Sequence, residues 1–343
     1  TAYMSVDFHQ MNGRDPYVYK TTDYGQTWRS IASDLPRSVF SYVHWVHEDP
    51  VRAGLLYLGT ENAIYVSFND GGNWLTLQNN LPHAPVHDVV VQEHFNDLVI
   101  ATYGRGFWIL DDVTPFQQLT DGVLASDAHL FAPRDAYRFH TIVGGPPVPN
   151  NAYINYYLKD APAGPVNIEI LDPQGEVVNT LRGTRDAGIN RISWNMRYPG
   201  PEQAKIRTKP PGNPTVVQEK RFREQWEEEG WIPVLSWGTQ GGFSGVRVAP
   251  GTYTVRMTVG GETFTQELEI LKDPRSDGTL ADIQEMVAMQ LQVRDDITTI
   301  SGMINDIEWM KKQINDLKES LERGENSAAI RSEADALYGR LQA

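Results

Sequence analysis

The chain has 343 residues, 40% of them hydrophobic and nine of them tryptophan, which is enough for two or three domains with apolar cores. Its formal net charge of −14 argues against a general nucleic-acid binder, which needs a basic face for phosphates. It has no cysteine for disulfides or metal ligation, and no run of 18 apolar residues that could span a membrane. We therefore expect no nucleic-acid partner and no membrane span.

A short motif occurs twice near the N-terminus, with its copies 46 residues apart. The pattern is Ser/Thr-x-Asp/Asn-x-Gly-x-Thr/Asn-Trp, and each copy lies between two short strand-like segments. A repeat of roughly 40–50 residues built from short strands indicates a β-propeller blade. The motif residues are Thr21, Asp23, Gly25 and Trp28 in the first copy and Ser67, Asn69, Gly71 and Trp74 in the second.

Each residue type in this motif has a structural task in a turn. The Asp or Asn side chain accepts backbone N–H groups, and the glycine takes a positive φ without steric cost. The tryptophan buries a large apolar face between neighbouring blades. We therefore expect these residues to be structural, with Trp28 and Trp74 each mostly buried against the next blade.

In chain order, residues 1–120 are predicted to form the last two to three blades of a propeller. The chain begins abruptly in a strand, and a propeller needs at least four blades to close. The sequence therefore predicts the C-terminal portion of a larger protein, whose N-terminal blades would be partners of this one.

A connector punctuated by Gly and Pro is predicted over residues 121–150. Residues 151–272 then show strands at the spacing of a β-sandwich, resembling immunoglobulin-like and fibronectin-III-like modules. The strands expected include Val246–Val248. An inserted loop at 199–245, with a short helix in it, interrupts the sandwich, and loops of this length are usually functional.

Residues 276–343 change to a helical period and predict an α-helical hairpin. Ile300, Ile307, Ile314 and Leu321 recur every seven residues, and Asp277 or Thr279 is the expected N-cap. Gly324 is expected to end the long helix. Two interpretations stay open: a hairpin that packs on its own stripe, or a coiled coil that binds a partner, including a second copy.

Five of the eight histidines fall within residues 44–94. His44 and His47 are three residues apart, so on a regular strand their side chains point to opposite faces. Metal ligation needs side chains that converge. We therefore expect no metal site and no cofactor.

Glu61 and Asp111 are the weak candidates for catalytic acids. Glycoside hydrolysis uses two carboxylates that flank one bond, and the adjacent Asp111 and Asp112 diverge in an extended chain. Turn and cap chemistry is the alternative for each acid. Arg105, between two glycines of a tight hairpin, and His87 are the candidate ligand contacts, with a structural ion pair as the alternative for Arg105.

Several segments together resemble the closing blades of large bacterial sortilin-like, or BNR (Asp-box) repeat, proteins that carry a glycosyl hydrolase label. They are Leu56–Glu61, the second motif, Val86–Asp88, Ala101–Asp112, Leu130–Arg134 and Lys272–Arg275. The resemblance implies export to the periplasm, the cell surface or the exterior. Because each motif has a sufficient structural explanation, we expect a non-catalytic binding or scaffold region that engages protein or glycan partners, whereas the hydrolase label alone favours a second function. The alternative is the C-terminal part of a glycoside hydrolase whose acids lie mostly in the missing blades.

Overall fold

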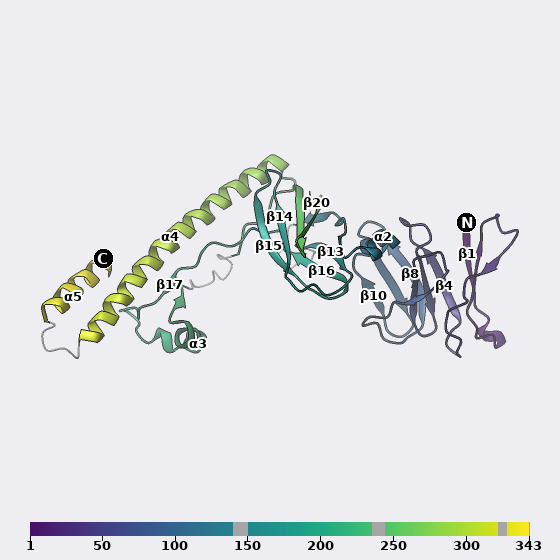
Figure 1. Ribbon diagram of the computed structural model, residues 1–343, viewed down its shortest axis with the longest axis horizontal. Helices are drawn as coiled ribbons and strands as arrows, with labels where there is room; N and C mark the ends of the chain where they lie inside the picture. Colours follow the sequence, from purple (N-terminus) through teal and green to yellow (C-terminus); the bar gives the residue numbers. More distant parts are fainter. Residues whose placement is uncertain (140–149, 235–243, 322–327, 343) are drawn as a thin grey trace. The chain divides into compact units, whose positions relative to one another are not determined.

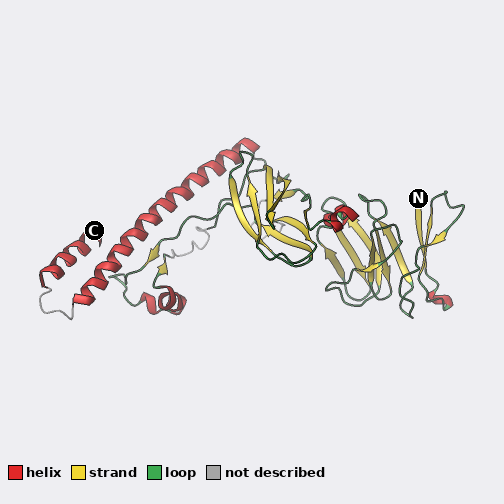
Figure 2. Ribbon diagram, viewed as in Figure 1, coloured by secondary structure: helices red, strands yellow, loops and turns green. Residues whose placement is uncertain are grey.

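The computed structural model describes residues 1–139, 150–234, 244–321 and 328–342. Over these residues the protein is mainly β, with several sheets followed by a C-terminal helical region (Figures 1 and 2). The chain forms two compact units: the first contains residues 1–137, 150–194 and 252–270, and the second contains the other described residues. Among the described residues, no helix combines the length and the apolar character needed to cross a membrane.

Three antiparallel sheets form the first part of the first unit. Each is a meander of consecutive strands: β1-β2-β3, β4-β5-β6-β7 and β8-β9-β10. The strands are β1 (Ala2–Val6), β2 (Tyr17–Thr21), β3 (Arg29–Ser30), β4 (Val43–Glu48), β5 (Leu56–Thr60), β6 (Ile64–Ser67), β7 (Leu75–Thr76), β8 (Val86–Gln92), β9 (Asp97–Thr102) and β10 (Phe107–Leu110), with the short 3-10 helix η1 (His9–Met11) after β1.

Strand β5 is shared by two apolar cores, and all five of its residues are buried. Leu56 and Leu58 lie in the core between the first and second sheets, whereas Tyr57 lies in the core between the second and third sheets. This alternation follows from the two-residue period of a strand. At Gly59, a Cβ atom would lie 2.6 Å from the carbonyl oxygen of Val86, so glycine allows β5 to approach β8 closely.

The two copies of the repeated motif form turns with the same hydrogen-bond pattern. In each copy, the Asp or Asn oxygen accepts the backbone N–H four residues later, and the Ser or Thr hydroxyl accepts the glycine N–H. The second copy keeps this pattern with Asn because an amide oxygen accepts the same N–H. The pairs are Thr27 N to Asp23 Oδ1 (2.9 Å), Gly25 N to Thr21 Oγ1 (3.0 Å), Asn73 N to Asn69 Oδ1 (2.9 Å) and Gly71 N to Ser67 Oγ (2.9 Å).

The two motif tryptophans differ in burial, and the expectation that both would be mostly buried against a neighbouring sheet is wrong for Trp28. Trp74 is 7% exposed and donates from Nε1 to the Ile31 carbonyl oxygen at 2.7 Å, between the first two sheets. Trp28 is 40% exposed and donates to Gly25 in its own turn at 3.1 Å. The reason is that Trp28 belongs to the first sheet, which among the described residues packs against only one of the other two sheets.

Two further sheets follow, with strand orders β11-β13-β16 and β12-β20-β19-β14-β15. The predicted connector at 121–150 is wrong in part, because it contains a helix and two strands; its Gly-Pro segment at 144–147 lies outside the described residues. Residues 246–248 form only an isolated bridge, Arg197 with Arg247, instead of the predicted strand. The elements are α1 (Thr114–Gln118), α2 (Asp121–Ala125), β11 (Ala128–Leu130), β12 (Ala136–Arg138), β13 (Ala152–Leu158), β14 (Val166–Leu171), β15 (Val177–Gly183), β16 (Gly188–Trp194), β19 (Gly251–Val259) and β20 (Glu262–Lys272).

A buried carboxylate joins the third sheet to the strands that follow it. Asp112 is 2% exposed, and its Oδ2 accepts a hydrogen bond from Asn155 Nδ2 in β13 at 2.8 Å. Arg191 of β16 donates to the carbonyl oxygens of Asp111 and Asp112 at 2.8 and 2.9 Å. These contacts tie the end of β10 to β13 and β16.

The second unit contains the inserted segment and the two long helices. The insertion forms β17 (Lys205–Ile206), η2 (Val216–Gln218), the predicted short helix α3 (Lys220–Glu229) and β18 (Ile232–Pro233). Helix α4 (Leu280–Leu321) begins at the predicted Thr279 cap, whose Oγ1 accepts the Asp282 N–H while the Asp282 carboxylate accepts the Thr279 N–H. Helix α5 (Ala328–Gln342) packs against α4 through Tyr338, and the expected stop at Gly324 lies outside the described residues.

Candidate functional site

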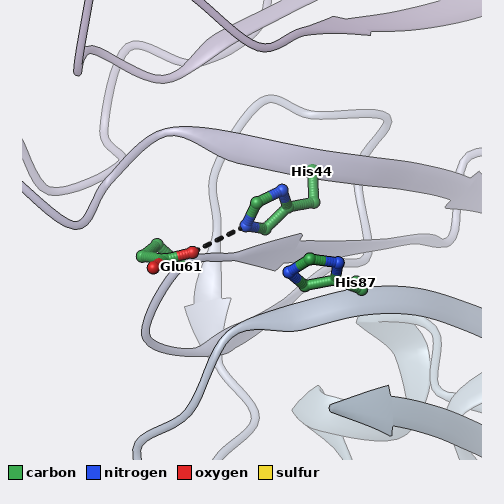
Figure 3. Close-up of side chains that lie close together, drawn as sticks. All are labelled: His44, Glu61 and His87. Atoms are coloured by element: carbon green, nitrogen blue, oxygen red, sulfur yellow. Dashed lines mark hydrogen bonds and ion pairs between the residues drawn. The ribbon is translucent and has the colours of Figure 1, made fainter. Parts of the chain in front are cut away.

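His44, Glu61 and His87 come from three separate strand ends and converge at one end of the second and third sheets (Figure 3). His44 lies near the start of β4, Glu61 directly follows β5, and His87 lies near the start of β8. All three offer side-chain ligand atoms that lie within 4.8 Å of one another. We call this set the His–Glu cluster.

Both histidines of the cluster lie at irregularities in their strands. The register between β4 and β5 shifts between Val43 and Trp45, and the register between β8 and β9 shifts between Val86 and Asp88. The residue at each shift is therefore His44 or His87. Such bulges occur often beside functional sites, where they change the direction of one side chain.

The contacts inside the cluster are short. His44 Nε2 and Glu61 Oε2 lie 2.9 Å apart, and the rings of His44 and His87 have centroids 4.3 Å apart at an angle of 30°. The side chain of His44 is 12% exposed and that of Glu61 is 24% exposed, while His87 is exposed to solvent. The cluster is thus covered on the His44 side and open on the His87 side.

Further polar and aromatic groups surround the cluster. Asp7, just after β1, places Oδ2 3.6 Å from Nδ1 of His44 and Oδ1 2.6 Å from Nδ1 of His9. The ring of His9 stacks on Tyr42 at 4.9 Å. Burial, together with the hydrogen bond and the charge of Glu61, raises the pKa of Tyr42 to about 12, so this phenol stays protonated at neutral pH.

An exposed ring extends the open side of the cluster. Tyr103 is 73% exposed and stacks on His87 with ring centroids 5.5 Å apart. It belongs to the β9–β10 turn, whose tip carries Arg105. The Arg105 carbonyl accepts a hydrogen bond from Trp108 Nε1 at 3.1 Å, while among the described residues its guanidinium makes no hydrogen bond or ion pair.

The structure brings two of the residues singled out from the sequence, Glu61 and His87, into one site and leaves Asp111 outside it. Asp111 follows Leu110, which pairs with Leu98, and Leu98 pairs with Val91 near the far end of β8. His87 and Gln92 are five positions apart in β8, which is about 16 Å of extended chain. Glu61 of the second sheet and Asp111 of the third sheet therefore lie at opposite ends of these two sheets, whereas glycosidase carboxyl groups lie about 5–9.5 Å apart.

His44 was not recognised from the sequence as a partner of His87. Its spacing from His47 on the same strand gave no convergence, while the structure pairs the His44 ring with a residue from the next sheet. A signal was present, because Val43–Val46 and Val86–Val89 share the quartet Val-His-x-Val. Equivalent positions in successive sheets place the two imidazoles side by side.

The second unit holds a cavity of about 650 Å³, and none of its lining residues belongs to the His–Glu cluster. Arg138, Arg197, Arg247 and Arg294 line it together with apolar residues of α4. Burial, and then the neighbouring charges of Arg138 and Arg197, lower the pKa of Arg247 to about 10, so its guanidinium group remains charged at neutral pH.

Comparisons with known proteins identify no relative. No protein-family model and no curated protein matches the chain. Among solved structures, trypsin-activated α-2-macroglobulin from Escherichia coli is 12% identical, with 63% of this chain and 12% of that chain covered and a TM-score of 0.21. Salmonella α-2-macroglobulin reacted with methylamine is 17% identical, with 64% and 12% covered and a TM-score of 0.22. These similarities are too low to indicate a fold or a function, and this chain spans only about an eighth of those proteins.

Proposed function

We propose that this chain is a non-catalytic binding and scaffold region of an exported protein of the BNR-repeat type, and that its ligand face is the end of the sheets where the His–Glu cluster lies. The observation that carries the proposal is that His44 and His87, each at a strand irregularity in consecutive sheets, converge with Glu61. Side chains aimed at one point by such irregularities are typical of a binding site.

A propeller-type arrangement of the first three sheets supports this proposal. Four-stranded meanders with matching turns between their last two strands are the units of such repeats. Here β4–β7 form a four-stranded meander, and cores between consecutive sheets hold the stack together. We propose that further blades outside this chain cover the first sheet, and that the sheets containing β13 and β14 form the immunoglobulin-like sandwich.

The ligand class that fits this face best is a glycan. The exposed Tyr103 ring offers an apolar surface stacked on the imidazole of His87, whose cluster also holds the Glu61 carboxylate, and sugars present both apolar C–H faces and hydroxyl groups. A protein partner is the other class that the resemblance implies. The alternative function, support of a glycoside hydrolase, requires acids from outside this chain, because Glu61 and Asp111 lie too far apart to act on one bond.

Glycan binding tests the proposal directly. The chain is applied to a glycan array, and Tyr103→Ala is compared with Tyr24→Ala, since Tyr24 is a fully exposed tyrosine in the first motif turn. We expect at least a tenfold loss of binding for Tyr103→Ala and none for Tyr24→Ala. Equal binding by both variants, or binding to proteins alone, would contradict the glycan assignment. Turnover of oligosaccharides that stops in Glu61→Gln or Asp111→Asn would contradict the non-catalytic assignment.

A second role, self-association, is supported by an exposed stripe on α4. Ile300, Met303, Ile307, Met310 and Leu317 are all at least 36% exposed. Together with the buried Ile314 they follow the alternating spacing of three and four residues that forms the contact seam of a coiled coil. We propose that a second copy of the chain covers this stripe.

A further inference from the structure

We propose that His44, Glu61 and His87 form a binding site for one divalent transition-metal ion, with Zn²⁺ as the best match. Two imidazoles and one carboxylate form a ligand set used by zinc sites that keep an open coordination position. Mg²⁺ and Ca²⁺ prefer oxygen ligands only, so the two imidazole nitrogens disfavour these ions.

The distances in the cluster require only a small rearrangement to bind the ion. Ligand atoms about 2.0–2.1 Å from a tetrahedral Zn²⁺ lie about 3.3 Å from one another. His44 Nε2 and Glu61 Oε2 are now 2.9 Å apart, and all ligand atoms of the cluster fall within 4.8 Å. Rotation of the exposed His87 ring would bring its nitrogen to the required separation without movement of a buried group.

Asp7 lies where it could support a metal-bound His44 after a small approach, because the present distance is slightly longer than a hydrogen bond. Such a histidine usually directs its second ring nitrogen to a carboxylate or carbonyl, which fixes the ring and increases its basicity. Asp7 Oδ2 lies 3.6 Å from Nδ1 of His44, while Nε2 of His44 faces Glu61. Among the described residues, neither ring nitrogen of His87 makes a hydrogen bond, so this ring is available for coordination.

The three protein ligands would leave one coordination position on the open side, beside His87 and Tyr103. Water, or an anionic group such as a carboxylate, would occupy that position. The ion would thus offer a coordination position to a ligand bound at the proposed ligand face. This ligand-binding role of the ion rests on the proposed function. Binding of Zn²⁺ alone is a property of the three side chains.

Metal binding is tested by equilibrium dialysis of the chain against Zn²⁺, followed by elemental analysis, with Co²⁺ as a spectroscopic probe. We expect one Zn²⁺ per chain and visible Co²⁺ absorption of the intensity typical of four-coordinate sites. His44→Gln, Glu61→Gln and His87→Gln should each weaken binding by more than about 100-fold. Asp7→Asn should weaken it about 10–100-fold, the usual effect of a supporting group.

His94→Gln is the matched control, since His94 is an exposed histidine beyond the other end of β8. It should bind Zn²⁺ like the unchanged protein. Unfolding curves recorded without metal show whether each variant folds, and the exposed His87 allows a test even if His44→Gln does not fold. Absence of stoichiometric Zn²⁺, or equal losses in His87→Gln and His94→Gln, would overturn the proposal. If the chain binds glycans but no Zn²⁺, the metal site is refuted and the proposed function is not. If it binds Zn²⁺ but no glycan, the proposed glycan ligand is refuted and the metal site is not.

Discussion

Trp28 and Trp74 occupy the same position of the same motif, yet the surroundings of their indole rings differ. Trp74 fills space between two sheets and donates a hydrogen bond to the neighbouring one, whereas among the described residues Trp28 donates only to Gly25 in its own turn. The motif therefore determines the local turn, and the neighbouring sheet determines how much each indole contributes to stability.

We predict that Trp74→Ala lowers the free energy of unfolding by about 3–5 kcal/mol, the usual effect of removing a large buried aromatic side chain. The loss of unfolding free energy for Trp28→Ala should be smaller than that for Trp74→Ala by at least about 1 kcal/mol, because 40% of the Trp28 surface is already in water. Urea unfolding followed by circular dichroism measures both values. Equal losses would show that Trp28 is covered in solution by another part of the protein.

A buried carboxylate on helix α4, that of Glu308, accepts hydrogen bonds from the inserted segment. Glu308 is 5% exposed and accepts hydrogen bonds from the backbone N–H groups of Arg207 and Thr208, at 2.8 and 2.9 Å, and from the Thr208 hydroxyl at 2.9 Å. Lys311 Nζ lies 2.7 Å from its other oxygen. Burial alone would raise the pKa of Glu308, but these hydrogen bonds, led by that of Lys311, outweigh burial and lower it.

We predict that Glu308→Gln lowers the free energy of unfolding at pH 7 by about 1–3 kcal/mol, because buried donors lose a charged acceptor. A lowered pKa means that the stabilisation is complete above the ordinary value of 4.5 and is lost as the pH falls through the folded-state pKa. The difference between Glu308→Gln and the unchanged protein should therefore shrink below about pH 4.5.

Asp306→Asn is the matched control for this prediction, because Asp306 is an exposed acid on the same helix and, among the described residues, makes no hydrogen bond or ion pair. Its unfolding curve should match that of the unchanged protein both at pH 7 and below about pH 4.5. A difference for Glu308→Gln that stays constant from pH 7 to pH 3 would show that the charge of Glu308 does not stabilise the fold.

At the scale of the whole molecule, the exposed stripe on α4 predicts a dimer. Light scattering after gel filtration should give about twice the 38.6 kDa mass of one chain at micromolar concentrations. The double change Met303→Glu and Ile307→Glu should return the mass to that of one chain, because it buries like charges in the seam. Gln284→Glu, which adds an acid at an exposed position outside the stripe, should leave the dimer intact. A single-chain mass for the unchanged protein at tens of micromolar would refute self-association.

Much of the secondary structure could be predicted because it depends on local patterns. The alternation in 152–158 and 166–171 identifies β13 and β14 with their observed bounds. Strand β15 gives no comparable signal in the sequence, because many polar side chains interrupt its apolar alternation. The short helices α1 and α2 span only five residues each, too few for a helical period to show.

The candidate site could be predicted only as separate residues. Glu61 and His87 were recognised one at a time, because their residue types are those of ligand contacts. Their meeting with His44 depends on the packing of consecutive sheets and on a shift of strand register at each histidine. Both are long-range effects, since an extra residue in a strand reverses the faces that simple alternation assigns.

The buried Asp112 limits how this protein can be divided into independently folding fragments. A fragment ending at residue 120, where the motif repeats suggest a boundary, would keep the Asp112 carboxylate but lose its donor Asn155 and the neighbouring guanidinium of Arg191. The Thr114 N–H, 3.2 Å from Asp112 Oδ1, would remain as a donor, but the end of the third sheet would lose the hydrogen bonds that connect it to β13 and β16. The shortest piece that keeps these contacts and every strand of the first unit's sheets therefore includes β13, β16 and the late hairpin of β19 and β20.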